Sequence, residues 1–401
     1  MDEKLFDVVN KTIDNEANFL NHISQEIWKF PELKFEEKFA HDLLTNALEK
    51  KGFTVERNFI LPTAFRAEFS SQKKGPAVVV ICEYDALPKI GHACGHNLIA
   101  ESGLGAGIAI KAALEEFPEI AGKVIVLGTP AEEGGGGKVT LINGGAFKAV
   151  DAALMVHPAP DDHLYPPFIG IKRKIISFTG QEAHASGYPW EGLNALDAAV
   201  GAYNNLALLR QHIKPTCRVH AIITKGGEAA NIIPGHTEMQ LFYRAAMTCD
   251  LDDLGKRVDA CITAAAVATG CEVKIDNDTD NAYKSLMTNK VLAERYKKYA
   301  EKLGTQFDDG NPKKIPFMAS SDMGDVSHVV PSIHPAYSIG TRACNHSVGF
   351  TKASGAPEAQ TTTLITAKSM AMVALDLMCD KDLLQEAKDQ FQRDLAEDSG
   401  A

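Results

Sequence analysis

The segment from Ala77 to Ala109 constrains the fold of this chain more than any other stretch of its sequence. It opens with six apolar residues, Ala77 to Cys82, of which four are β-branched. An unbroken apolar run of this length predicts a strand buried on both faces, as in a parallel sheet covered by helices. The segment closes on a run of small residues typical of a helix that packs tightly: Gly103, Gly105, Ala106, Gly107 and Ala109.

Polar residues crowd the carboxyl end of this predicted strand, where Glu83, Asp85, His92, Cys94 and His96 follow within fifteen positions. Open α/β sheets place their sites at this edge. Any one of these residues alone is more often an ordinary buried or surface residue, but their clustering favours a metal site. Cys94 and His96 are separated only by a glycine, so a thiolate and an imidazole can turn to one point, while Asp85 can hold the far nitrogen of a ligand histidine. A redox role for Cys94 lacks a second cysteine two or three residues away.

Two further apolar runs end in the same way. Val124 to Pro130 leads into Glu132 and Glu133, which are followed by four glycines, Gly134–Gly137. The glycines alone would suit a linker or a phosphate-binding loop, but the Lys-Ser/Thr ending of a phosphate loop is missing. Adjacent carboxylates at the end of a buried strand need a cation or a proton between them, so we interpret one as a ligand and one as a base.

A third apolar strand, predicted at 151–157, ends in His157. On its own this imidazole is as well explained by a capping role as by metal binding. Three strands that deliver Cys/His, Glu/Glu and His to one sheet edge make the ligand interpretation the stronger one.

The pattern changes near Phe168. The following strands and helices are expected at 171–179, 194–211, 218–224, 237–244, 251–269 and 272–276. Their order, strand-helix-strand-strand-helix-strand, is the split β-α-β pattern of a small ferredoxin-like α+β module. We therefore expect an α/β fold in which a doubly wound domain, built from 1–170 and 287–401, carries an inserted module at 171–286.

Four other polar residues stand out, although local sequence does not settle their roles. His184, Asn231 and Arg244 lie in the insert, and by themselves are best explained as a loop residue, a turn former and an exposed strand charge. His346 lies in a loop before the last predicted helix at 359–379, where it is a candidate fourth metal-facing group.

Composition excludes several classes of protein. The 401 residues have 45% hydrophobic and 23% charged side chains, as in an ordinary globular protein. A net charge of -11, from 41 basic and 52 acidic side chains, argues against a nucleic-acid partner. No apolar run approaches about 20 residues, so no membrane span is expected. Eight scattered cysteines and an M-D-E-K start without an apolar signal segment predict a cytoplasmic protein.

Seven short motifs are spread over nearly the whole chain: Asp85-Ala86-Leu87-Pro88, His92-Ala93-Cys94-Gly95-His96, Pro130 to Gly137, His157-Pro158, Ala183-His184-Ala185, Asn231-Ile232-Ile233-Pro234 and Asn345-His346. In this order they resemble the binuclear metal amidohydrolases and dipeptidases, a family that includes aminoacylases, carnosine-type dipeptidases and hydrolases of hippurate and auxin conjugates. Four longer runs resemble its β-alanyl-lysine (Xaa-Arg) dipeptidase branch: Cys82 to Pro88, Ile90 to Glu101, Tyr188 to Ala199 and Tyr203 to Leu206.

The resemblance implies hydrolysis of dipeptides that have a free C-terminal carboxylate and end in Lys, Arg or ornithine. It implies two divalent metal ions, and an inserted domain that acts as a lid and mediates homodimerisation. Position by position, the resemblance implies that the metal ligands are Cys94, His96, Glu133, His157 and His346. It implies that Glu132 is the general base and that Asp85 supports the metal site. It also implies that His184 contacts the reacting carbonyl, often in the partner's site, and that Asn231 and Arg244 bind the terminal carboxylate of the substrate.

Two alternatives stay open at this point. The first is an N-acyl-amino-acid or aminobenzoyl-glutamate amidohydrolase that uses the same centre, and the second is a non-catalytic binding protein that has kept the fold. Zinc and manganese are both retained as candidate metals, because thiolate and imidazole favour zinc whereas related hydrolases with this cysteine often use manganese. Relatives with His at the place of Glu83 and Asp at that of Cys94 use a different ligand set, so Glu83 is not expected to be a ligand.

Overall fold

The computed structural model describes residues 2–308 and 319–400. The chain forms two compact units: unit 1 comprises Met1–Pro167 and Leu286–Ala396, and unit 2 comprises Phe168–Ser285 and Glu397–Ala401. The expected range 287–401 assigned the whole carboxyl end to the first domain, whereas residues from Glu397 onward group with unit 2. The roles of the two units as catalytic domain and lid stay predictions.

A six-stranded sheet forms the centre of unit 1, in the order β1-β2-β4-β3-β5-β11. The strands are β1 (Thr54–Arg57), β2 (Phe65–Ser70), β3 (Ala77–Glu83), β4 (Lys123–Thr129), β5 (Ala152–Leu154) and β11 (Ser332–Ile333). Strand β3 pairs in parallel with β4 and β5, and only β1 and β2 bring in antiparallel pairing. The carboxyl ends of the central strands therefore meet at one edge.

The strand predicted at 151–157 is divided in the structure. Its first part is β5, whereas His157 begins β6 (His157–Ala159), which pairs with β12 (Ala336–Ser338) in a separate two-stranded sheet. His157 therefore lies beyond the edge of the main sheet and not at the end of one of its strands.

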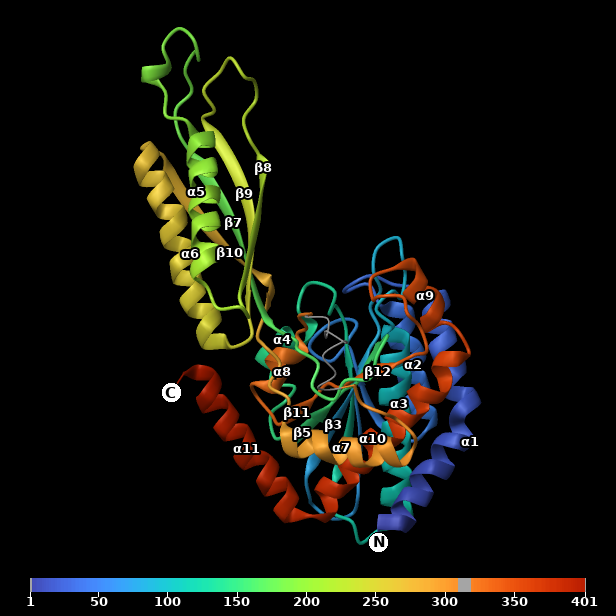
Figure 1. Ribbon diagram of the computed structural model, residues 1–401. Helices are drawn as coiled ribbons and strands as arrows, with labels where there is room; N and C mark the ends of the chain where they lie inside the picture. Colours follow the sequence, from blue (N-terminus) through green and yellow to red (C-terminus); the bar gives the residue numbers. More distant parts are fainter. Residues whose placement is uncertain (1, 309–318, 401) are drawn as a thin grey trace. The chain divides into compact units, whose positions relative to one another are not determined.

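Helices cover both faces of this sheet (Figure 1). Val78 and Val80 of β3 pack in a cluster with α1 (Asp2–Lys29), α3 (His96–Glu116), α7 (Lys290–Lys302) and α10 (Glu358–Cys379). Val79 and Ile81, which point to the other face, pack with α4 (Gly137–Asn143) and α8 (Met323–Ser327). The apolar run thus forms a strand buried on both faces, and the doubly wound arrangement expected from it is confirmed. The remaining helices of this part of the chain are α2 (Lys38–Lys50), α9 (Val348–Ser354) and α11 (Lys381–Ser399).

The small residues of α3 allow it to lie directly on the sheet. A Cβ on Gly103 would overlap the carbonyl oxygen of Ile81, and one on Gly107 would overlap the side chain of Val126. Close packing fixes the start of α3, where Cys94 and His96 lie, relative to the ends of β3 and β4.

Helix α10 is the one helix in the described residues whose length and composition would suit a membrane span. However, 78% of its apolar window is buried inside the structure, where it packs in the core cluster with α3. Its hydrophobicity is therefore accounted for by the core. All eight cysteines are free.

Unit 2 is a four-stranded antiparallel sheet with two helices. The strands are β7 (Gly170–Thr179), β8 (Arg218–Lys225), β9 (His236–Ala245) and β10 (Glu272–Tyr283), in the order β10-β7-β9-β8. Helices α5 (Ala195–Leu209) and α6 (Thr248–Thr269) pack against this sheet in one core cluster. The chain order β-α-β-β-α-β confirms the ferredoxin-like module expected from the sequence.

Candidate metal centre

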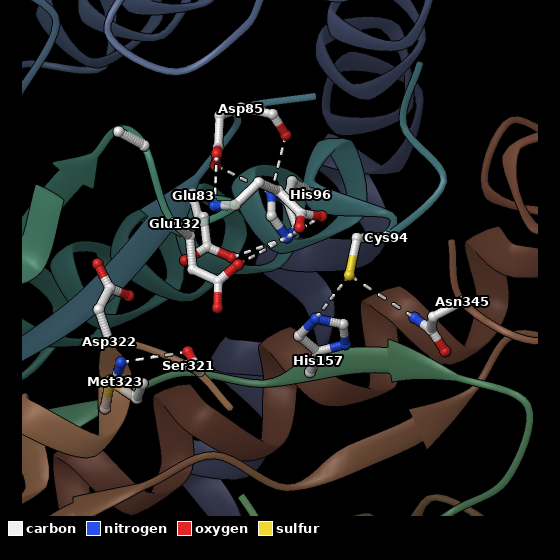
Figure 2. A network of polar contacts seen from close by, with 12 residues as sticks. Glu83, Asp85, Cys94, His96, Glu132, His157, Ser321, Asp322, Met323 and Asn345 are labelled. Atoms are coloured by element: carbon white, nitrogen blue, oxygen red, sulfur yellow. Dashed lines mark hydrogen bonds and ion pairs between the residues drawn. The ribbon is translucent and has the colours of Figure 1, made fainter. Parts of the chain in front are cut away.

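The carboxyl edge of the unit 1 sheet gathers donor groups from five segments (Figure 2). They lie just after β3, at the start of α3, after β4, at the start of β6 and in the loop before α9. The seven residues brought together are Asp85, Cys94, His96, Glu132, Glu133, His157 and His346. All seven were predicted site residues, and the structure adds that they lie close together.

Unusual backbone conformations hold the loops in place. Gly95, which precedes α3, has φ +78°, and a Cβ there would lie 2.5 Å from Pro158, next to His157. His346 also has a positive φ, +63°, and its amide donates to the carbonyl of Ala93 over 2.8 Å. Non-glycine residues in this region are strained and persist only where their surroundings fix them. The loop that carries His346 is therefore tied to the loop that carries Cys94.

Donor atoms from different segments lie close to one another. Cys94 Sγ is 3.4 Å from His157 Nε2, and Glu133 Oε1 is 3.4 Å from His346 Nε2. Three groups have donor atoms all within 4.8 Å: Cys94, His96 and His157; Cys94, Glu133 and His346; and Glu83, His96 and Glu132. Cys94 belongs to the first two groups, so its sulfur lies between two sets of donors.

Asp85 orients two of these donors. Its carboxylate Oδ1 lies 3.0 Å from His96 Nδ1, and its carbonyl oxygen lies 2.8 Å from the same nitrogen. Because both partners are acceptors, Nδ1 carries a proton, and in the neutral imidazole Nε2 then presents its lone pair to the centre. The other oxygen, Oδ2, accepts a hydrogen bond from the backbone amide of Glu133 over 2.9 Å. Such a carboxylate behind a histidine is the usual support of a metal ligand.

The donor set fits a pair of divalent cations. Among the described residues, His96 Nε2 and Glu133 Oε1 are buried and make no hydrogen bond. Buried polar atoms normally have partners, so these two call for a cation or a proton. Metal–ligand bonds of about 2.0–2.3 Å in tetrahedral geometry place two ligands of one ion about 3.3–3.8 Å apart. The two separations of 3.4 Å fall within that range.

Burial dominates the electrostatics of the centre. It raises the pKa of the Cys94 thiol and lowers the pKa of His157 to about 3, so without a cation both groups are neutral. Burial, with the charges of Glu83 and Glu133, also raises the pKa of Glu132 well above its ordinary range. For His96 burial acts in the opposite direction, but attraction to Glu83 and Asp85 outweighs it and raises the pKa.

A buried charge network that sequence reasoning missed lies next to the centre. The ammonium of Lys138, fully buried, contacts Glu83 Oε2 and lies 2.7 Å from Asp322 Oδ1. The backbone amide of Lys138 donates to Asp322 Oδ2 over 2.9 Å. Glu83 Oε1 in turn lies 3.1 Å from His96 Nε2. The sequence offered only a weak signal, a lysine directly after four glycines, because its partners are 55 and 184 positions away.

Two other neighbours of the centre were also missed. The amide of Asn345 points at Cys94 Sγ over 3.9 Å and donates to the carbonyl of Pro158 over 3.1 Å. The ring of His334 stacks on that of His157, with 5.5 Å between centroids. Asn345 is part of the Asn345-His346 motif but was given no role of its own, whereas nothing in the pattern around His334 distinguishes it from an ordinary core residue.

The other three predicted site residues, His184, Asn231 and Arg244, belong to unit 2. The segments that carry His184 and Asn231 pair through their backbones, since Ala185 N donates to Asn231 O over 3.1 Å. His184 Nδ1 accepts from the amide of Gly187 over 3.0 Å. Arg244 lies half-buried on β9, where burial lowers its pKa.

Comparison with known proteins places the whole chain among metallopeptidases. Residues 80–360 match the family model described as "Peptidase family M20/M25/M40". The chain is 45% identical over 398 residues to Xaa-Arg dipeptidase of Mus musculus, covering 96% of this chain and 92% of the mouse protein. It is 28% identical to one of the subunits of p-aminobenzoyl-glutamate hydrolase from Escherichia coli (strain K12), covering 98% of this chain and 95% of that protein.

Solved structures share the fold at low identity. A dinuclear metal-binding peptidase of the M20 family from Bacillus subtilis superposes with a TM-score of 0.72 at 17% identity, covering 91% of this chain and 99% of that one. An aminohydrolase from methicillin-resistant Staphylococcus aureus has a TM-score of 0.78 at 20% identity, covering 94% and 100%.

Proposed function

This chain belongs to peptidase family M20/M25/M40, and from that premise we propose that it is a metal-dependent dipeptidase for substrates with a basic C-terminal residue. The observation that carries the proposal is the convergence of Cys94, His96, Glu133, His157 and His346 at one edge of the unit 1 sheet, with Glu132 beside them. The 45% identity to Xaa-Arg dipeptidase over 96% of the chain supports the preference for a C-terminal Lys, Arg or ornithine.

The five converging donors would hold two divalent cations. When bound, the cations supply Lewis-acid polarisation of the amide carbonyl and make water more acidic. Asp85 keeps His96 in the tautomer that a metal needs and at the same time holds the backbone of Glu133. Thiolate and imidazole donors suit zinc, and manganese is the second candidate.

Glu132 would act as the general base and acid. Its carboxylate Oε2 lies 3.9 Å from His96 Nε2, beside the proposed metal ligands, and the residue is buried with 8% exposed. The positive charge of bound cations would favour the ionised carboxylate over the protonated form that burial alone favours. Glu132 would then take a proton from the attacking water and give it to the leaving amine. Transfer of this kind contributes about 10²–10⁴ in rate.

The residues of unit 2 would bind substrate. Arg244 offers a planar pair of donors that match a carboxylate, which a lysine would not match in geometry. Asn231 would assist at the same carboxylate, and His184 would donate to the reacting carbonyl. We further propose that unit 2 acts as a lid and mediates a homodimer, and that the enzyme works in the cytoplasm, which its free cysteines suit.

A substrate panel with metal analysis tests the function. The purified protein is stripped with a chelator, reloaded with zinc or manganese, and assayed on β-alanyl-lysine, N-acetyl-amino acids and aminobenzoyl-glutamate. Metal-dependent cleavage of the basic dipeptide is expected. Preference for aminobenzoyl-glutamate would favour the alternative suggested by the 28% identity to that hydrolase, and activity indifferent to metal would overturn the proposal.

A further inference from the structure

Glu37 is a buried carboxylate outside the metal centre, and three donors converge on it. Its Oε1 accepts hydrogen bonds from the backbone amides of Phe35 and Ala131, each over 2.9 Å. Its Oε2 accepts from the hydroxyl of Thr63 over 2.8 Å. The residue is 0% exposed and lies directly before α2, 94 positions from Ala131. A carboxylate buried at such cost is retained only where its bonds matter.

The most informative of these bonds is the one to Ala131, the residue before Glu132. Ala131 is fully buried and has φ +61°, a left-handed conformation that costs an alanine about 1–2 kcal/mol. Its carbonyl oxygen accepts from Gly137 N over 3.3 Å, which closes the glycine loop. The hydrogen bond to Glu37 thus fixes the amide of Ala131. Because the backbone dihedrals of Ala131 set the direction in which the chain continues, they also set the direction of Glu132.

The same segment also packs on the glycines. Phe35 has φ +63°, and its ring covers Gly135, where a Cβ would lie 2.5 Å from the ring. Gly135 itself has φ +106°. Glu37 Oε1 therefore accepts hydrogen bonds from both Phe35 and Ala131. The loop from Ala131 to Gly137, which carries Glu132, is thus bonded at Ala131 and packed against Phe35 at Gly135.

Residues near Glu37 also form hydrogen bonds to the residues on either side of Asp85. The carbonyl oxygen of Glu32 accepts from the amide of Ala86 over 2.8 Å, directly after Asp85. Tyr84, directly before Asp85, donates its hydroxyl to the carbonyl of Thr63 over 2.5 Å. The segment Glu32–Glu37 is thereby bonded beside both acidic residues that the mechanism uses.

We propose that Glu37 is a positioning residue that fixes the direction of Glu132 through the amide of Ala131. The inference rests on the proposed role of Glu132 in hydrolysis. Displacement of a reacting group by about 1 Å can cost about 10² in rate, so loss of this bond affects turnover more than binding. Among the described residues, the side chain of Glu37 accepts hydrogen bonds from Phe35, Thr63 and Ala131, none of which is a proposed metal ligand, so its effect on Glu132 passes through the loop.

The test compares three variants with a matched control. Glu37→Leu removes both acceptors, Glu37→Asp withdraws the carboxylate by one methylene, and Glu37→Gln keeps an acceptor for the two amides while its NH₂ faces Thr63. Glu36→Leu makes the same change at the exposed neighbouring position. For Glu37→Leu we expect kcat to fall by about 10² with KM and metal content unchanged. Glu37→Asp should show a smaller fall in kcat, and Glu37→Gln and the control should have activity near wild type. If the Leu variant does not fold, the Asp–Gln pair decides.

Two further measurements separate positioning from general damage. In a Glu132→Gln background, Glu37→Leu should cost nothing more, because the group that it positions is already gone. Amide hydrogen exchange of the peptide 129–137 needs no substrate, and it should be faster in Glu37→Leu than in wild type and unchanged in Glu37→Gln. If exchange is faster in Glu37→Leu but the wild-type protein cleaves no peptide, the proposed function is refuted, while the structural effect of Glu37 on the loop is supported. Unchanged exchange, full activity of the Leu variant, or additive losses with Glu132→Gln would overturn the positioning role.

Discussion

The predicted site residues of unit 1 and of unit 2 differ in how firmly the fold holds them. In unit 1, His96 and Asp85 are 0% and 1% exposed, and Asp85 is bonded through both carboxylate oxygens. In unit 2, His184 and Asn231 are exposed, and their neighbouring segments pair mainly through the backbone. Buried groups with complete bonding are fixed before any ligand arrives, whereas exposed side chains can adjust to it. This contrast accords with the proposed roles, chemistry for the first set and substrate binding for the second, with His346 as the exposed member of the first set.

The largest expected effect comes from Glu132→Gln, which tests whether the unit 1 set does the chemistry. The amide cannot take up the proton, so kcat should fall by about 10²–10⁴ while KM and metal content stay unchanged. Steady-state kinetics and elemental analysis check this. Glu116→Gln, an exposed change of the same kind, should have no effect. Loss of metal together with activity would instead make Glu132 a ligand, and the division of roles in unit 1 would be wrong.

Asp85→Asn tests whether prior orientation matters. The amide cannot accept from both His96 and Glu133, so one ligand loses its support and metal affinity should fall by about 10–100-fold. Chelator competition measures the affinity directly. The same substitution at the exposed Asp42 is the control. An unchanged affinity would mean that the ligands hold themselves in place.

Arg244→Lys tests the unit 2 set. Loss of the planar fork should raise KM about 10-fold and leave kcat and metal content close to wild type. Arg218→Lys is a matched control, because Arg218 lies opposite Arg244 on the neighbouring strand β8 and is exposed. A fall in kcat with constant KM would show that Arg244 acts in the chemical step, and the contrast between the two units would lose its basis.

The smallest effect concerns a buried acid of unit 1 away from the centre. Burial raises the pKa of Glu101 to about 7, against hydrogen bonds from Gln360 and Ser24 that lower it. The folded state therefore keeps a proton that the unfolded state releases above pH 4.5, and this contribution to stability is lost as pH rises through 7. Glu101→Gln should remove the loss and raise the melting temperature relative to wild type by up to about 5 °C at pH 8, but not at pH 4.5.

Melting curves of both proteins at the two pH values, with metal held at one concentration, measure this difference. Glu116→Gln, at an exposed position, should show none. An equal shift at both pH values would mean that packing, and not the proton, distinguishes the Glu101 variant.

The sequence predicted the sheet edge because local signals were strong there. The apolar run Ala77–Cys82, with four β-branched residues among six, favours a buried strand, and the motifs around Cys94 and Glu132 identify the donors that the structure brings together. The division of the strand at 151–157 was not predictable, because Met155 and Val156 are as apolar as the strand residues before them and only tertiary pairing with β12 separates the two parts.

The supporting residues escaped prediction for a different reason. Glu37 meets Ala131 across 94 positions, and Lys138 meets Asp322 across 184. Their local sequences resemble those of ordinary surface helices and loops and give no signal of burial. Burial of a charged group follows from its distant partner, which a single sequence does not identify.

The enclosed ammonium of Lys138 also limits how this chain can change over evolutionary time. Replacement of Lys138 alone leaves the carboxylates of Glu83 and Asp322 away from water without their shared cation, at a cost of about 3–5 kcal/mol, which is a large part of the stability of most proteins. Evolution can replace these three residues either through an intermediate protein that is barely folded or by substituting all three together. Positions 83, 138 and 322 are thus expected to mutate as one inherited unit, although they are scattered along the gene.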